Sequence, residues 1–395
     1  PTSYVAVKIA RAQGDHRSAG RREPIMRCPS ARRSLLALSL CACASAVRVA
    51  GRNLVLSASA TTFPALQNDA LLRAARGEKV EKVPVWLFRQ AGRHLPEYNE
   101  YKAAKGKNFL QLLEDPADVT EVTMQPVRRY DVDAAILFSD ILVVPQAFGV
   151  KVEMPGGVGI QVPEPLTSPV DMKRLTLPET PEMASKLVRE KLPHVLQAVH
   201  DIRMELNGKV PLIGFSAAPW TLLYYMVGGS SKKGLDEGER WLKEYPEDFD
   251  YLMSVLRTTV IEYLSLQVEA GAQVLQVFEA MGDKISPAGF EAHAVPHMAA
   301  IAKELRARHP DVPLMVFPRG AAHALPSLQM AGYECLAIDN TVDLTTARDQ
   351  FPGVCLQGSF DPALLVTGTP ESVKQATNEM LDKLGPQLLI ANLFE

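Results

Sequence analysis

Two arginines four residues apart follow an apolar run in the segment "PVWLFRQAGRHLPEY" at 84–98. On a short helical turn, Arg89 and Arg93 would point their guanidinium groups the same way, which indicates an anionic ligand. Two further polar groups follow apolar runs: Asp140 lies in "FSDIL" and Tyr225 in "PWTLLYYM". These four side chains are the candidates for binding and catalysis.

Each candidate also has a structural interpretation, which the spacing alone leaves open. The two arginines could form surface ion pairs with Glu97 or Glu100. Asp140 precedes apolar residues, as the N-cap of a helix does. Tyr225 and Trp220 could be core aromatics. The position of the arginines directly after a buried run favours a binding role for that pair.

Short apolar runs alternate with longer helical patterns from about residue 70 onward. We expect strands at 83–88, 134–138, 210–215, 273–278, 312–317, 335–338, 354–358 and 388–392. Apolar residues at helical spacing over 255–269 predict one of the helices between them. Eight such units predict an α/β fold of the (β/α)8 TIM barrel type. A doubly wound sheet is less compatible, because the Gly-rich first turn is absent. The Gly/Pro-rich segment 152–166 predicts a hairpin or a lid.

Active sites of such barrels lie at the carboxyl ends of the strands. Read in order, those ends are "RQAGR", "SD", "SAAPW", "EAMGD", "PRG", "DNT", "SFDP" and "NLFE". The fifth end adds Arg319 to the arginines of the first and the carboxylate of the second. This combination predicts a polyanionic ligand with a cationic or N–H-rich centre.

The charge distribution argues against nucleic acid as a partner. The 395 residues carry a formal net charge of -3, but the first 60 are basic and residues 61–395 have a net charge of -11. Binding to phosphate backbones requires a basic face. Only Cys335 and Cys355 lie in the body, and neither a disulfide framework nor a zinc pattern results. His293 and His297 would share a helix face but lack the glutamate of an HExxH motif, so no metal site is predicted.

The N-terminal 68 residues have the composition of a targeting presequence. No acidic residue occurs from 26 to 68, and arginines precede an apolar run at 34–46 that ends in Ala-Ser-Ala. That run is too short to span a bilayer, and we interpret 26–46 as a signal peptide followed by a transit peptide. The alternative is a disordered tail with a chance apolar run. We therefore expect a presequence over 1–68, a barrel over 69–395, plastid localisation and no stable membrane insertion.

Five motifs resemble the uroporphyrinogen decarboxylase family over about residues 68–392. They are "PVWLFRQAGRHLPEY", "ILFSDILVVPQAFG", "PLIGFSAAPWTLLYYMVGG", "AGYECLAID" and "LQGSFDP". The resemblance implies a (β/α)8 barrel that forms a homodimer and uses neither a metal nor an organic cofactor. It also implies that the four acetates of uroporphyrinogen III are decarboxylated to give coproporphyrinogen III for haem and chlorophyll synthesis.

The resemblance assigns roles to residues of these motifs. Arg89 and Arg93 would hold substrate carboxylates, and Gln90, Ala91 and Gly92 would let the backbone approach. Asp140 would accept the pyrrole N–H groups and stabilise the positive charge formed when a pyrrole carbon is protonated. Tyr225 would contact the substrate near Asp140. Arg89 is the favoured proton donor, although the ordinary pKa of arginine exceeds roughly 12.

The sequence departs from the family pattern in four places. Ala280 stands where the family usually has Ser, Asn340 where it has Trp, and Ala217 where it has Gly. The family continues past Asn-Leu with Gly-His and a final helix, whereas this sequence stops at "ANLFE". We therefore expect a last strand without a covering helix and a chain truncated at its C-terminus.

These departures keep two alternatives to the enzyme open. The first is a porphyrinogen-binding paralogue without turnover, which Ala280 and the missing His favour. The second is a zinc-dependent methyltransferase of corrinoids on the same barrel. It requires a His-Cys-Cys set, and the two remaining cysteines do not supply its His-x-Cys part. The retained Arg89, Arg93, Asp140 and Tyr225 favour the enzyme.

Overall fold

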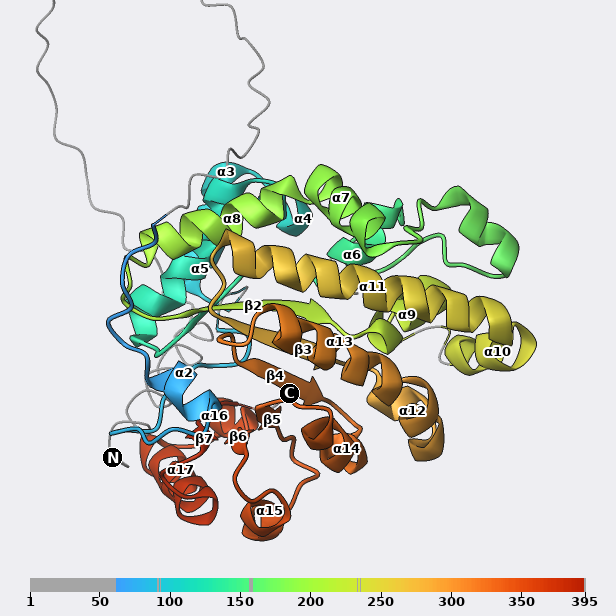
Figure 1. The fold of residues 1–395 in the computed structure, drawn as a ribbon. Coiled ribbons are helices and arrows are strands. Elements are labelled where there is room, and N and C mark those ends of the chain that lie inside the picture. The colour runs from blue at the N-terminus through green and yellow to red at the C-terminus, as the bar shows by residue number, and fades with distance from the viewer. Residues whose placement is uncertain are drawn as a thin grey trace, which may run out of the picture.

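A parallel β-sheet forms the centre of the computed structural model (Figure 1), which describes residues 62–393 except 91, 93, 156–158, 233 and 235. Its seven strands pair in chain order, each parallel to the next. They are β1 (Ala135–Ile136), β2 (Leu212–Ala217), β3 (Val274–Glu279), β4 (Leu314–Pro318), β5 (Cys335–Ala337), β6 (Cys355–Gln357) and β7 (Leu389–Ile390). Seven of the eight predicted strands are thus confirmed, and the sheet curls.

Helices follow the strands and cover the outer face of the curled sheet (Figure 1). The longest, α11 (Pro246–Ala270), packs against β2 and contains the helix expected at 255–269. The other helices are α2 (Ala70–Ala75), α3 (Pro96–Lys105), α4 (Phe109–Leu113), α5 (Pro116–Tyr130), α6 (Val143–Phe148), α7 (Pro181–Lys191), α8 (Pro193–Glu205), α9 (Pro219–Gly228), α10 (Glu237–Glu244), α12 (Pro287–His293), α13 (Val295–Arg308), α14 (Leu325–Met330), α15 (Leu344–Gln350), α16 (Ala363–Thr367) and α17 (Pro370–Leu384). Short 3-10 helices span Pro169–Arg174, Gly282–Lys284 and Ala322–Ala324. No helix in the described part of the chain is long and apolar enough to cross a membrane.

The predicted first strand, 83–88, forms only one bridge, a parallel one between Val85 and Ala391. It nevertheless contacts both ends of the sheet: Asp133 N, just before β1, donates to Val85 O (2.7 Å), and Ala391 N, just after β7, donates to Pro84 O (2.9 Å). The segment forms no regular ladder because its own amides are directed to side chains. Val85 N donates to Asp133 Oδ2 (2.9 Å) and Phe88 N to Asn392 Oδ1 (2.7 Å).

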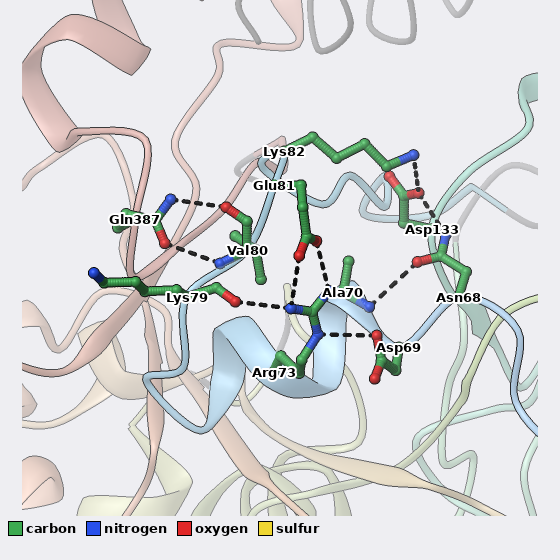
Figure 2. A network of polar contacts seen from close by, with 10 residues as sticks. All are labelled: Asn68, Asp69, Ala70, Arg73, Lys79, Val80, Glu81, Lys82, Asp133 and Gln387. Carbon is green, nitrogen blue, oxygen red and sulfur yellow. Dashed lines mark hydrogen bonds and ion pairs between the residues drawn. The ribbon is translucent and has the colours of Figure 1, made fainter.

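A polar network anchors the segment that precedes this strand (Figure 2). Asp133 is 1% exposed and accepts from Asn68 Nδ2 (2.9 Å), while Lys82 Nζ lies 3.6 Å from the same carboxylate. Gln387, just before β7, exchanges two hydrogen bonds with the backbone of Val80 (2.9 and 3.0 Å). Residues 68–85 are therefore fixed to residues beside the two outer strands of the sheet, β1 and β7.

The last strand is covered, contrary to our expectation. Leu389, Ile390 and Ala391 are fully buried, and α2 packs against β7. The helix comes from the segment before the first strand, which lies beside β7 because of the Val85–Ala391 bridge. A strand's cover need not follow it in sequence, and our expectation had assumed that it does.

The segment 152–166 contains the expected hairpin. Glu153 and Gln161 form an antiparallel bridge with two hydrogen bonds of 2.8 Å. Residues 156–158 at its centre lie outside the described residues. Its role as a lid stays a prediction. The presequence predicted over 1–68 lies outside the described residues up to 61.

Candidate active site

The candidate polar residues follow the carboxyl ends of different strands. Asp140 comes four residues after β1, Tyr225 lies in α9 directly after β2, and Arg319 follows the last residue of β4. Arg89 follows the bridged segment 83–88. Because the strands are parallel, all these positions lie at the same edge of the sheet.

Asp140 is a buried carboxylic acid. Asp140 is only 8% exposed, and its Oδ1 accepts a hydrogen bond from Leu142 N (2.7 Å). Burial raises the pKa of Asp140 to about 6, although hydrogen bonds from the amides of Leu142 and Ile141 act in the opposite direction. The hydrogen bond closes a turn ahead of α6, whose N-cap is Leu142. Asp140 is therefore not the cap of that helix.

Tyr225 shares its surroundings with the other candidates. Burial raises the pKa of this phenol, and the negative charge of Asp140 raises it further. A hydrogen bond with Ser231 and the positive charges of Arg319 and Arg89 act in the opposite direction. The phenol of Tyr225 thus lies within electrostatic range of Asp140, Arg89 and Arg319. The roles of these residues in binding and catalysis stay predictions.

The arginine loop differs from the expected helical turn. Arg89 has a φ of 60°, which is left-handed, so no right-handed turn begins there. Its guanidinium is exposed to solvent, with Cζ 5.9 Å from the centre of the Phe88 ring. Gly92 is buried, and its carbonyl accepts from Leu95 N (3.2 Å). Ala91 and Arg93 lie outside the described residues, so the paired geometry of the two arginines stays a prediction.

Gln90 has a supporting role in this loop. Its buried amide accepts from Leu87 N (3.1 Å) and donates to Ala134 O (3.0 Å). These two bonds attach the loop to the start of β1. The side chain is therefore engaged within the protein, and Gln90 N also donates to Leu87 O (2.8 Å). The approach of this backbone to a ligand stays a prediction.

Four phenylalanines near the ends of different strands form an aromatic floor, a feature our sequence reasoning missed. Phe88 lies 5.4 Å from Phe278 and 5.6 Å from Phe317 between ring centres, and Phe215 lies 5.6 Å from Phe278. All these pairs are edge-to-face, the arrangement that aromatic rings favour. A signal was present in the sequence, because five of the predicted strands end in Phe and four of these residues form the floor.

The two histidines lie on different helices, not on one as expected. His293 ends α12, and His297 lies in the first turn of α13, which begins at Val295. Among the described residues, no group of three or more His, Cys, Asp or Glu is placed to hold a metal ion. Two surface hollows are present. One, of about 710 Å³, is lined by α7, α11 and α13, and the other, of about 500 Å³, is lined by α3 and α5. Neither hollow contains a candidate residue.

A comparison with protein families decides the assignment. The model of the uroporphyrinogen decarboxylase (URO-D) family matches residues 66–393. The chain belongs to the uroporphyrinogen decarboxylase family. It is 44% identical over 333 residues to the uroporphyrinogen decarboxylase of Salinibacter ruber, a match that covers 84% of this chain and 91% of the relative. The uroporphyrinogen decarboxylases of Danio rerio and Homo sapiens are 43% and 42% identical, with 84% of this chain and 89% of each relative covered.

A solved structure of more distant sequence has the same fold. A methyltransferase from Methanosarcina mazei matches with a TM-score of 0.68 at 18% identity, covering 83% of this chain and 92% of that chain. At this identity the likeness concerns the fold alone.

The uroporphyrinogen decarboxylase pattern usually has Ser at the position of Ala280, and the structure shows what surrounds the substituted residue. Ala280 N donates to Thr221 Oγ1 (2.8 Å), and the same hydroxyl donates to the fully buried Glu279. Burial raises the pKa of Glu279 to about 7, although hydrogen bonds from Thr221, Met281 and Ala280 oppose the shift. The backbone at this strand end is thus held without a serine.

The two other substitutions differ in their surroundings. Ala217 is buried at the end of β2, beside Phe278 in the sheet register. Asn340 is exposed, directly after the buried Asp339. A polar side chain therefore faces solvent at the position where the family usually has an indole.

Proposed function

We propose that this chain decarboxylates the four acetate side chains of uroporphyrinogen III and releases coproporphyrinogen III for haem and chlorophyll synthesis. Family membership over 66–393 supports this assignment. The observation that carries it is the buried Asp140 carboxyl beside Tyr225, with Arg89 at the same sheet edge and the aromatic floor nearby.

The site chemistry suits a flat macrocycle with a polar centre and a carboxylate-rich rim. The pyrrole rings would pack on the apolar floor formed by Phe88, Phe215, Phe278 and Phe317. The N–H groups at the centre would donate to Asp140, and the guanidinium groups of Arg89 and Arg93 would bind rim carboxylates.

The reaction replaces one carbon dioxide by one proton at each acetate. Protonation of a pyrrole carbon, with Arg89 as the proposed donor, makes the ring an electron acceptor. The bond between the acetate methylene and its carboxylate then breaks, its electron pair enters the ring, and carbon dioxide leaves. Proton addition to the methylene and proton loss from the ring carbon give the methyl group. A preorganised Asp140 carboxylate would stabilise the cationic ring throughout.

We also propose that the sheet closes as a (β/α)8 barrel, with 83–88 as its first strand. The hydrogen bonds of this segment to residues beside β1 and β7 support closure. So does the interior: Trp86 Nε1 donates to Gln357 Oε1 of β6 (3.0 Å), and Gln357 Nε2 donates to Gln276 Oε1 of β3 (3.3 Å).

The decisive test is turnover of enzymatically prepared uroporphyrinogen III under anaerobic conditions, with the oxidised products separated by their number of carboxyl groups. Stepwise formation of species with seven, six, five and four carboxylates would support the enzyme. Binding of the porphyrinogen without any decarboxylation would favour the non-catalytic paralogue instead. The zinc methyltransferase is not favoured, since the matched relatives carry the decarboxylase name.

Assembly and localisation remain proposals that rest on the resemblance and on composition. We propose a homodimer, which the mass in solution tests. We propose a plastid address in 1–68, supported by the absence of acidic residues from 26 to 68. A fluorescent protein carrying residues 1–68 should enter the plastid, and the same fusion lacking 26–46 should stay in the cytosol.

A further inference from the structure

Arg319 is a cation mounted on the strand ends of the candidate site. It directly follows β4, and its backbone N donates to Glu279 O at the end of β3 (3.0 Å). Its guanidinium Nη1 donates to the carbonyl of Ala280 (2.9 Å). Backbone and side chain are therefore both fastened to the neighbouring strand end, which fixes where the guanidinium lies.

The two loops that hold Arg319 interlock closely. A Cβ at Gly282 would lie 2.8 Å from Arg319 O and 2.7 Å from Ala321 Cβ. A Cβ at Gly320, whose φ is 72°, would lie 2.8 Å from Asp283 Cβ. Only glycine fits at either position without displacing the other loop. The loops after β3 and β4 thus form one close-packed support, which limits the motion of the arginine.

The guanidinium has no anionic partner within the described part of the chain, where its contact with the Ala280 carbonyl is its one hydrogen bond. The acids nearby are engaged elsewhere. Asp339 accepts from Gly320 N (3.2 Å) and from Thr341, and Asp283 pairs with Lys284 (2.7 Å). A guanidinium has five N–H groups, so the bond to Ala280 leaves an edge able to bind a carboxylate bidentately.

The charge of Arg319 acts on the same Tyr225 phenol as the charges of Arg89 and Asp140. Together with Arg89, it opposes the rise in the pKa of the Tyr225 phenol. Phe317, two residues earlier on β4, belongs to the aromatic floor. A ligand that lay on this floor and reached Asp140 would place its rim next to Arg319.

We propose that Arg319 binds one carboxylate of the porphyrinogen substrate, as an anchor on the β4 side of the site. The inference rests on the proposed function, which supplies a substrate with eight carboxylates. It adds a subsite that is separate in sequence from the arginines of 84–98, and so it constrains the orientation of the macrocycle from a second strand end.

The test compares Arg319→Met and Arg319→Lys with the control Arg306→Met. Arg306 is an arginine away from the site whose Nη1 also donates to a single backbone carbonyl, that of Gly332 (2.8 Å). Unlike Arg319, it pairs with an acid, Glu334 (3.4 Å). Initial rates against uroporphyrinogen III concentration give KM and kcat. Anaerobic fluorescence quenching gives the affinity for uroporphyrinogen III without turnover. Thermal unfolding reports on the fold of each variant.

We expect Arg319→Met to weaken uroporphyrinogen III binding and raise KM by roughly 10- to 100-fold, the effect of one charge-assisted contact. The kcat should stay within about threefold, Arg319→Lys should recover part of the affinity, and the control should match the wild type. An unchanged affinity of Arg319→Met for uroporphyrinogen III would overturn the proposal. The same holds if this variant has a lower melting temperature but binds uroporphyrinogen III as tightly as the wild type. If the wild type binds the macrocycle but does not turn it over, the proposed function fails while the binding measurement still tests Arg319.

Discussion

Replacement of Asp140 by Asn should inactivate the protein and stabilise it at the same time. Asn is isosteric, and its Oδ1 can still accept the hydrogen bond from Leu142 N (2.7 Å). The charge that would stabilise a cationic ring is lost. Removal of one preorganised electrostatic group typically costs about 3–4 kcal/mol in the transition state, or roughly 10²–10³ in rate. We expect a fall of that size in kcat for uroporphyrinogen III.

The gain in stability follows from the raised pKa. Burial moves the pKa of Asp140 from 3.8 to about 6, so between these values the native state binds more protons than the unfolded state. The stability of the wild type therefore falls as pH rises through this window, and the full penalty is present above pH 6. Two pKa units correspond to about 3 kcal/mol. Asp140→Asn should remove most of this penalty and raise the melting temperature by a few degrees at pH 8, with no gain near pH 4.

Asp118 provides a control of opposite sign. It is fully buried, whereas Asp140 is 8% exposed, and it contacts Lys105 (3.0 Å), Lys107 and Tyr101. Burial would raise the pKa of Asp118, yet these partners outweigh burial and lower it. Asp118→Asn should therefore lose stability at pH 8. Calorimetry at pH 4 and pH 8 and a decarboxylation assay decide the matter for both variants. An Asp140→Asn protein that is less stable at pH 8 yet fully active would refute the reasoning and leave Asp140 as a turn residue.

Three further outcomes follow from the site geometry. If ionised Asp140 is required, kcat/KM of the wild type should hold above pH 6 and fall about tenfold per unit below it; a flat profile from pH 5 to 8 would contradict this. Thr221→Val removes the hydroxyl that donates to buried Glu279 and should cost about 2–3 kcal/mol of unfolding free energy in urea titrations; a loss below 0.5 kcal/mol would mean that the hydroxyl is dispensable. Asn392→Leu takes away the acceptor of Phe88 N, so we expect a loss of about 1–3 kcal/mol and a higher KM as the arginine loop loosens, and an unchanged KM would show that this tie does not position the loop.

The strand positions could be predicted because a buried parallel strand reads as a continuous apolar run. The sequence did not reveal which acceptor each backbone N–H of a strand would bond to. The run at 83–88 has the same pattern as the others, yet Asp133 and Asn392 intercept two of its N–H groups. Asp133 is 48 residues from Val85, and Asn392 is 304 residues from Phe88. No local sequence pattern predicts contacts between residues so far apart. The burial of β7 under α2 was missed for the same reason.

Individual site residues were predictable where a strand end fixed their place. Asp140 and Tyr225 lie at one sheet edge because β1 and β2 are parallel neighbours. The backbone of the arginine loop was not predictable, since spacing of four suggests a helical turn and Arg89 instead has a positive φ. The break between His293 and His297 was visible in principle, because Pro296 favours the first turn of a new helix.

The aromatic floor and Asp140 together explain why a carboxylate is placed where it is poorly solvated. In the free protein, burial disfavours the ionised form, and the amides of Leu142 and Ile141 compensate only in part. On the proposed function, the missing donors are the four N–H groups of the substrate, which would meet the carboxylate as the macrocycle settles on the phenylalanines. The same donors would lower the pKa of Asp140 in the complex, so the group would be ionised at neutral pH when the ring is protonated. A solvated carboxylate would need no such partner, but its field would be screened and would stabilise the cationic ring far less.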